Sequence, residues 1–255
     1  MLFHEKVVLV TGASSGIGAA IAEYFAKNGA FVAITGRSLE NLEKTKVSCK
    51  KVSSHEPLLI QADVTKDAQR IISETISHFN RLDVLVNNAG VLRGGSVEAA
   101  TLEDYDYMMN TNVRAVFHLT TLAVPHLIAS HGNVVNVSSV AGLRSFPNCL
   151  VYCMSKATID QMTRCCALDL AQKGVRVNSV NPGVIITDIH KRGGMDDEAY
   201  EAYLEHSKTT HAMGRVGNVE EVVEAVGFFA SNEKSSFITG ATLPIDGGKH
   251  AMCPR

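Results

Sequence analysis

Tyr152 and Lys156 are the two side chains in this sequence whose types and spacing point most directly to chemistry. In a helix, residues four apart lie on the same face, so the phenol and the ammonium are expected to be neighbours. A phenol loses its proton near pH 10, and an adjacent positive charge lowers that pKa by favouring the phenolate. Ser139, thirteen residues upstream, offers a hydroxyl that can hold a substrate oxygen. The three side chains suit proton transfer to or from a carbonyl or alcohol oxygen.

The same spacing has an ordinary structural explanation. Tyr and Lys four residues apart are common on amphipathic helices that have no catalytic role. The choice between the two explanations depends on what the rest of the chain places around the pair.

A glycine-rich turn over residues 11–18, TGASSGIG, is typical of a phosphate-binding loop. It follows a predicted strand and opens a predicted helix. Glycine allows a tight turn and close approach of the backbone to a pyrophosphate, and the positive helix end favours the anion. The spacing departs from the strict G-x-G-x-x-G pattern. Residues 12–16 also match the G-x-S-x-G of serine hydrolases, an alternative that the position on the first strand and the Tyr152/Lys156 pair disfavour.

The residues after the second predicted strand bear on which dinucleotide binds. NAD-selective sites usually place Asp or Glu there to bind the ribose 2′-hydroxyl. Here Arg37 and Ser38 occupy that place, and they can pair with a 2′-phosphate. The sequence therefore favours NADP(H). The alternative, in which Arg37 only begins a surface helix, leaves NAD(H) possible.

Apolar runs alternate with amphipathic segments along the whole chain, which predicts βαβ units and a parallel sheet covered by helices on both faces. The expected fold is a single-domain α/β Rossmann fold, residues 1–255, with a doubly wound parallel sheet of about seven strands. Predicted strands cover residues 6–10, 30–35, 58–62, 84–86, 133–137, 175–180 and 241–245; predicted helices cover residues 16–28, 39–53, 66–80, 102–130 (with a possible kink at Pro125), 151–173 and 220–231.

Composition excludes several classes of function. The 255 residues carry a formal net charge of −2, which gives no electrostatic reason to expect nucleic-acid binding. We expect no apolar run that reaches the ~18 residues of a membrane span, and no secretory signal. The six cysteines lack the paired spacing of a zinc site or disulfide framework, so we expect reduced thiols, no metal and a cytoplasmic protein.

Taken together, these motifs resemble the short-chain dehydrogenase/reductase family, of the single-domain kind that includes 3-oxoacyl reductases and hydroxysteroid or carbonyl reductases. The resemblance covers nearly the whole chain and rests on motifs in the family's order. These are residues 11–18, Asp63-Val64, Asn87-Asn88-Ala89-Gly90, Asn112, Ser139, Tyr152, Lys156, Asn181-Pro182-Gly183 with Thr187, and Asp246-Gly247-Gly248. Met154 departs from the alanine often found there, with an expected effect on local packing only.

The resemblance implies a catalytic set and a cofactor site. Tyr152 would donate the proton, and Ser139 would orient the substrate oxygen. Lys156 would bind the nicotinamide ribose and, with the cationic oxidised ring, keep the tyrosine pKa low, and Asn112 would hold a relay water. The expected cofactor-binding residues are Gly12, Ser14, Ser15, Gly16, Ile17, Gly18, Arg37, Ser38, Asp63, Val64, Asn88, Ala89, Gly90, Lys156, Pro182, Gly183 and Thr187.

Residues 184–213 interrupt the alternating pattern, and we expect an irregular substrate lid there. Its apolar residues favour a moderately apolar alcohol or ketone: a steroid-like, acyl-chain or xenobiotic carbonyl. The alternatives are a 3-oxoacyl thioester reductase and a non-catalytic dinucleotide-binding sensor. By the resemblance, residues 102–130 and 151–173 form a subunit interface, so a homotetramer or homodimer is expected.

Overall fold

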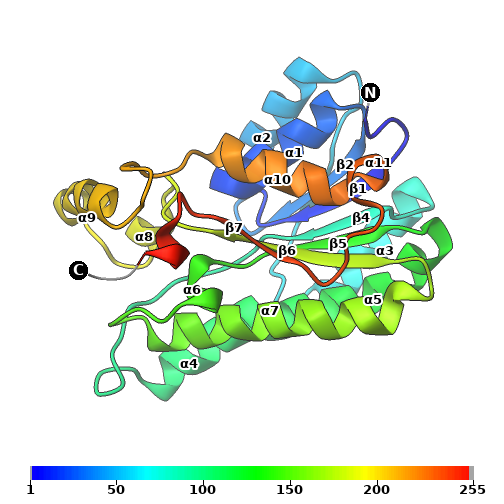
Figure 1. Ribbon diagram of the computed structural model, residues 1–255. Coiled ribbons are helices and arrows are strands. Elements are labelled where there is room, and N and C mark those ends of the chain that lie inside the picture. Colours follow the sequence, from blue (N-terminus) through cyan, green and yellow to red (C-terminus); the bar gives the residue numbers. More distant parts are fainter. Residues whose placement is uncertain (1, 253–255) are drawn as a thin grey trace.

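Seven parallel strands form one sheet through the middle of the molecule (Figure 1). The computed structural model describes residues 2–252. Its strand order, β3-β2-β1-β4-β5-β6-β7, confirms the predicted doubly wound sheet. The strands are β1 (Val7–Thr11), β2 (Phe31–Gly36), β3 (Leu58–Gln61), β4 (Val84–Asn87), β5 (Asn133–Val137), β6 (Arg176–Pro182) and β7 (Thr242–Ile245).

Helices cover both faces of the sheet. Every predicted strand is found, and so are the predicted helices outside residues 102–130, with ends displaced by at most two residues. The helices are α1 (Gly16–Lys27), α2 (Leu39–Val52), α3 (Ala68–Phe79), α4 (Leu102–Met109), the π-helix η1 (Asn110–Arg114), α5 (Ala115–Ser130), α6 (Val140–Leu143), α7 (Leu150–Ala171), α8 (Ile189–Arg192), α9 (Asp197–Thr209), α10 (Val219–Ala230), α11 (Asn232–Ser235) and the 3-10 turn η2 (Lys249–Ala251).

The two helical layers explain why the strands are apolar without interruption. In β1, Val8 and Val10 pack into the core beneath α1, α2 and α10. Val7 and Leu9, on the other side of the same strand, pack into the core formed with α3, α5 and α7. Successive side chains of a strand point to opposite faces, so each strand must supply apolar residues to both cores.

The strand order reverses between β1 and β4, which lie side by side at the centre of the sheet. From β1 the chain proceeds outward to β2 and β3, and from β4 it proceeds the other way to β5, β6 and β7. A crevice forms beyond the carboxyl ends of the strands at such a switch point.

The stretch predicted as one helix over residues 102–130 is divided by η1. Pro125 was predicted as a possible kink, but it lies inside α5 and does not end the helix. The irregularity instead surrounds Asn112, whose buried amide bonds to the backbone of Val91 and to Ser155. These bonds favour the π geometry, a form often found at functional sites.

Residues Leu102–Ser130 are also, by length and composition, long and apolar enough to cross a membrane, with a mean hydropathy of 1.2. The prediction that no segment meets this criterion is therefore wrong. The core helix of a globular protein passes the same test. In this structure α5 packs against the sheet through Leu119, Ala123 and Leu127, while Phe117 on its other side is 59% exposed.

Segment 184–213 was predicted to be irregular, and this is wrong, because the segment contains α8 and the thirteen-residue α9. The carboxylate of Asp196 caps α9 by accepting a hydrogen bond of 2.8 Å from the Ala199 N–H. Asp197 and Glu198 lie in the first turn and Lys208 in the last, which suits the helix dipole. The helix signal was present in the sequence.

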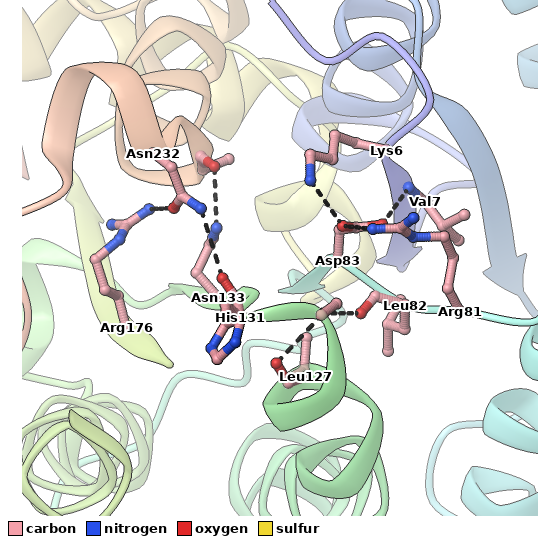
Figure 2. Close-up of polar contacts among 12 residues, drawn as sticks. Lys6, Val7, Arg81, Leu82, Asp83, Leu127, His131, Asn133, Arg176 and Asn232 are labelled. Carbon is pink, nitrogen blue, oxygen red and sulfur yellow. Dashed lines mark hydrogen bonds and ion pairs between the residues drawn. The ribbon is translucent and has the colours of Figure 1, made fainter. Parts of the chain in front are cut away.

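The amino-terminal edge of the sheet is closed by a polar network (Figure 2). Asp83, just before β4, accepts hydrogen bonds from Lys6, the Val7 N–H and Arg81. At the start of β6, Arg176 donates to Asn232 at 2.8 Å. These contacts join strand starts to the helices and loops that precede or follow them.

Candidate active site

The turn between β1 and α1 has the backbone that a phosphate-binding loop requires. Gly12 and Gly16 have φ values of +64° and +55°, in the left-handed region that favours glycine. A Cβ on Gly18 would lie 2.3 Å from the Gly12 carbonyl oxygen, so only glycine fits. Ser15 is the N-cap of α1, and its side chain makes no capping hydrogen bond. The α1 terminus is thus built to accept an anion.

Asn88 and Thr11 hold this turn against the end of β4. The Asn88 amide donates to the carbonyl oxygens of Thr11 and Gly12 at 2.8 and 3.2 Å. The Thr11 hydroxyl accepts from the N–H groups of Asn88 and Ala89, both at 3.0 Å. The turn is fixed before any ligand arrives.

A cleft of about 870 Å³ opens beyond the carboxyl ends of β1, β2 and β4. Most of the predicted cofactor residues line it, whereas Pro182 and Gly183 are not among its lining residues. The glycine conformations, the open end of α1 and the long cleft fit a dinucleotide. The predicted residues that line the cleft are Gly12, Ser14, Ser15, Gly16, Ile17, Gly18, Arg37, Ser38, Asp63, Val64, Asn88, Ala89, Gly90 and Thr187.

Arg37, Ser38 and Asp63 line the same cleft. Ser38 caps α2 by accepting a hydrogen bond from the Asn41 N–H at 3.3 Å. Burial raises the pKa of Asp63, but hydrogen bonds from Thr65 and the charge of Arg37 outweigh it, so the net shift is downward. Asp63 is therefore an anion close to the Arg37 guanidinium.

The four predicted catalytic residues come together from three elements. Ser139 follows β5 and caps α6, Tyr152 and Lys156 lie on α7, and Asn112 lies on η1. All four are buried. They are not among the residues lining the cleft, but Gly90 is, and a Cβ on Gly90 would lie 3.4 Å from Asn112 Oδ1 and 3.6 Å from Lys156 Nζ. Because glycine has no side chain, the cleft at Gly90 comes close to Asn112 Oδ1 and Lys156 Nζ.

Hydrogen bonds leave Ser139 ready to donate. Its Oγ accepts from the Ala141 N–H at 3.1 Å, so its own hydrogen is free for a substrate oxygen or for Tyr152. Asn112 differs, since its amide is engaged with the Val91 backbone and Ser155. The relay water assigned to Asn112 stays a prediction.

Burial dominates the protonation of the catalytic pair. It raises the pKa of Tyr152, and the Ser139 hydroxyl opposes that rise. It lowers the pKa of Lys156 to about 8. Lys156 Nζ donates to the Val137 carbonyl at 2.9 Å and lies 5.7 Å from the Tyr152 ring centroid. In the protein groups alone burial has the largest effect on the Tyr152 pKa. The lowering of that pKa by Lys156 together with the oxidised nicotinamide ring stays a prediction.

Two residues near the site were missed by the sequence reasoning. Arg192, on α8, lines the cleft and donates to the Ser15 hydroxyl at 2.7 Å. Asp160 lies on α7 one turn after Lys156 and is buried. The i, i+4 spacing from Lys156 could have identified Asp160 in the sequence. Arg192 lies 177 residues from Ser15, so no local pattern indicated that contact.

The fold and cleft define a dinucleotide-binding α/β protein, with the predicted catalytic residues close to the cleft. A family model described as enoyl-(acyl carrier protein) reductase matches residues 12–250. The chain is 40% identical to an uncharacterized oxidoreductase of Thermotoga maritima over 99% of this chain and 100% of that protein. It is 36% identical to the 3-oxoacyl-(acyl-carrier-protein) reductase of that organism over 97% and 99% of the two chains.

Solved structures agree with these relatives. A short-chain dehydrogenase/reductase of unknown function from Caenorhabditis elegans, solved with cofactor, superposes with a TM-score of 0.93 at 37% identity, covering 99% and 98% of the two chains. The chain belongs to the short-chain dehydrogenase/reductase family and is a pyridine-nucleotide-dependent oxidoreductase.

Proposed function

We propose that this protein interconverts a secondary alcohol and a ketone on a moderately apolar substrate, with NADP(H) as the preferred cofactor. The observation that carries the proposal is that Lys156 Nζ lies near Gly90 of the dinucleotide cleft and 5.7 Å from the Tyr152 ring centroid, with the Ser139 hydroxyl next to Tyr152. The nicotinamide supplies or accepts the hydride.

The protein's own residues manage the proton and the substrate oxygen. Because Tyr152 is protonated in its buried site, it is ready to donate to a carbonyl oxygen during reduction. Ser139, with its hydrogen free, holds and polarises that oxygen. Lys156 binds the ribose hydroxyls through the donors that Val137 does not use. Asn112 orders the relay water and, through Val91, the backbone beside the cleft.

NADP(H) is favoured by the charges at the end of β2. Arg37 and Ser38 line the cleft where a 2′-phosphate would lie. No acidic residue occupies residues 35–38, where one would bind a ribose 2′-hydroxyl. NAD(H) stays the alternative cofactor, since Arg37 would not prevent a ribose 2′-hydroxyl from binding.

We assign residues 184–213 to a substrate lid within one catalytic domain. Tyr200 donates to the Thr187 carbonyl at 3.0 Å, and the His190 and Tyr203 rings lie 4.6 Å apart between centroids. Val91, Leu92, Phe146 and the apolar face of Tyr152 belong to one cluster, which suits an apolar carbonyl.

A 3-oxoacyl thioester reductase is the second candidate, favoured by the 3-oxoacyl-(acyl-carrier-protein) reductase among the relatives. The deciding experiment assays hydroxysteroids, alkyl and cyclic ketones and 3-oxoacyl thioesters with NADPH and NADH. Selective turnover of thioesters would replace the first candidate with the second. No turnover of any class, with dinucleotide still bound, would favour the sensor.

We further propose a cytoplasmic homotetramer or homodimer without membrane or nucleic-acid partners. Exposed apolar residues on α5 and α7, including Phe117 and Leu168, suit a contact with a second copy. The five cysteines in the described part of the chain are free thiols, which suits a reducing compartment. Light scattering of the purified protein tests the assembly.

A further inference from the structure

Asp160 is a buried carboxylate that the catalytic roles above do not use. It is 2% exposed, on the face of α7 that also carries Lys156. The Asn181 amide donates to its Oδ2 at 2.8 Å, and the Ser179 hydroxyl lies 3.2 Å from its Oδ1. A carboxylate is costly to bury unless donors and a positive charge accompany it. Here the positive charge is the catalytic lysine.

One of these donors connects Asp160 to Ser139. The Asn181 amide that binds the carboxylate also donates to the Ser139 carbonyl oxygen at 2.9 Å. Gly142, in the short helix that Ser139 caps, packs directly on the carboxylate, since a Cβ there would lie 2.3 Å from Oδ2. Movement of the carboxylate would therefore displace the segment that aims the Ser139 hydroxyl.

The charge of Asp160 acts on Lys156. Burial lowers the pKa of Lys156 to about 8, and Asp160 opposes that fall. In return, burial raises the pKa of Asp160, while hydrogen bonds from Ser138, Asn181 and Ser179 and the charge of Lys156 oppose the rise. Tyr152, on the same helix, also lies beside Lys156, with its ring centroid 5.7 Å from Nζ.

We propose that Asp160 is a positioning residue of the active site: its ionised carboxylate fixes Asn181 against the Ser139 segment and keeps Lys156 as an ammonium. This rests on the oxidoreductase function proposed above. It adds a fifth residue that acts through Ser139 and Lys156 without touching substrate or cofactor.

Asp160→Asn tests the charge with little change of shape, because the amide oxygen can still accept from Asn181. The readout is the pH titration of the Lys156 Cε signal by NMR in the cofactor-free protein, assigned with Lys156→Arg. Loss of a negative charge one helical turn away should lower the pH at which Lys156 titrates by about one unit. The alkaline limb of kcat for ketone reduction should move the same way, with kcat reduced about tenfold or more and the cofactor Kd unchanged.

Asp169→Asn is the matched control, since it removes an exposed carboxylate from the same helix. It should leave both readouts at their wild-type values. An unchanged Lys156 titration in Asp160→Asn would overturn the proposal. Because that titration needs no substrate, it stays informative even if the wild-type protein turns over no ketone, the result that would instead defeat the proposed function.

If Asp160→Asn does not fold, Asp160→Ser, which leaves room for water, gives the same readout. The carboxyl 13C shift of Asp160 in the wild-type protein supplies a further test that needs no variant. An ionised carboxylate at pH 7 supports the proposal, and a protonated one contradicts it.

Discussion

The two edges of the sheet both bury charged and polar groups, but they differ in how fully those groups are paired. At the amino-terminal edge, Asp83 accepts hydrogen bonds from Lys6, Val7 and Arg81, two of them from the Arg81 guanidinium (Figure 2). At the carboxyl edge, within the described residues, Lys156 has one hydrogen-bond acceptor, the Val137 carbonyl, for its three N–H donors. Both carboxylate oxygens of Asp83 are paired, whereas Lys156 keeps donors for a ligand.

The pKa shifts follow that difference. Burial raises the pKa of Asp83, yet its donors outweigh burial and the net shift is downward, towards the charged form. For Tyr152 and Lys156 burial prevails, and each shifts towards its neutral form. A group that the protein holds in its charged form, such as Asp83, stabilises the fold. Groups whose pKa values burial shifts towards the neutral form, such as Tyr152 and Lys156, are available for proton transfer. The smaller hollow of about 460 Å³ near Phe31 and His55 at the amino-terminal edge contains none of the predicted site residues.

The largest expected effect that separates the edges is that of Tyr152→Phe. Removing the hydroxyl should lower kcat on the order of 10²–10⁴-fold, because the proton donor is lost. NADPH affinity and the unfolding midpoint should change little. Steady-state kinetics, fluorescence titration with NADPH and thermal unfolding measure the three quantities. Tyr105→Phe, at an exposed position on α4, is the control; near-normal turnover in Tyr152→Phe would remove Tyr152 from its role.

Asp83→Ala should have the opposite profile, with stability lost and chemistry kept. The Val7 N–H, Lys6 and Arg81 lose a buried acceptor, which costs about 2 kcal/mol of unfolding free energy. Activity per folded molecule should equal that of the wild type.

The effect of Asp83→Ala should depend on pH. The folded pKa of Asp83 is depressed, so its contribution is present above the unfolded pKa near 4 and is lost as pH falls through the folded value. Urea unfolding at pH 7 and pH 3 checks this. A difference between wild type and variant that is as large at pH 3 as at pH 7 would contradict the assignment.

Arg37→Asp should change cofactor choice without disturbing Asp83 or the Tyr152/Lys156 pair. An acid at this position repels a 2′-phosphate and can bind a ribose 2′-hydroxyl, so the ratio of kcat/KM for NADPH over NADH should fall about tenfold or more. Lys51→Asp, the same charge change at an exposed position of α2, controls for net charge. Unchanged NADPH kinetics would show that Arg37 does not select the cofactor.

Sequence alone predicted what depends on near neighbours in the chain. The glycine turn, the Tyr152/Lys156 spacing and the doubly wound parallel sheet all follow from local pattern and the rules of parallel sheets. The π segment around Asn112 was not predictable, because it depends on bonds to Val91 and Ser155 made only after folding. Helix α9 was predictable from its Asp196 cap but was taken for irregular chain.

The smallest effect expected is that of Arg192→Ala, a contact that only the folded chain creates. Arg192, on α8, donates to the Ser15 hydroxyl at 2.7 Å, at the end of α1 where a phosphate would bind. Losing one exposed cation near a phosphate should weaken NADPH binding about threefold. Lys191→Ala is the matched control, because Lys191 pairs with Asp197 and does not line the cleft. Calorimetric titration with NADPH at two salt concentrations measures the difference, which should shrink at high salt if charge is the cause. Equal NADPH affinities of the two variants at low salt would show that Arg192 does not contribute to phosphate binding. The anion site would then consist of the α1 turn alone.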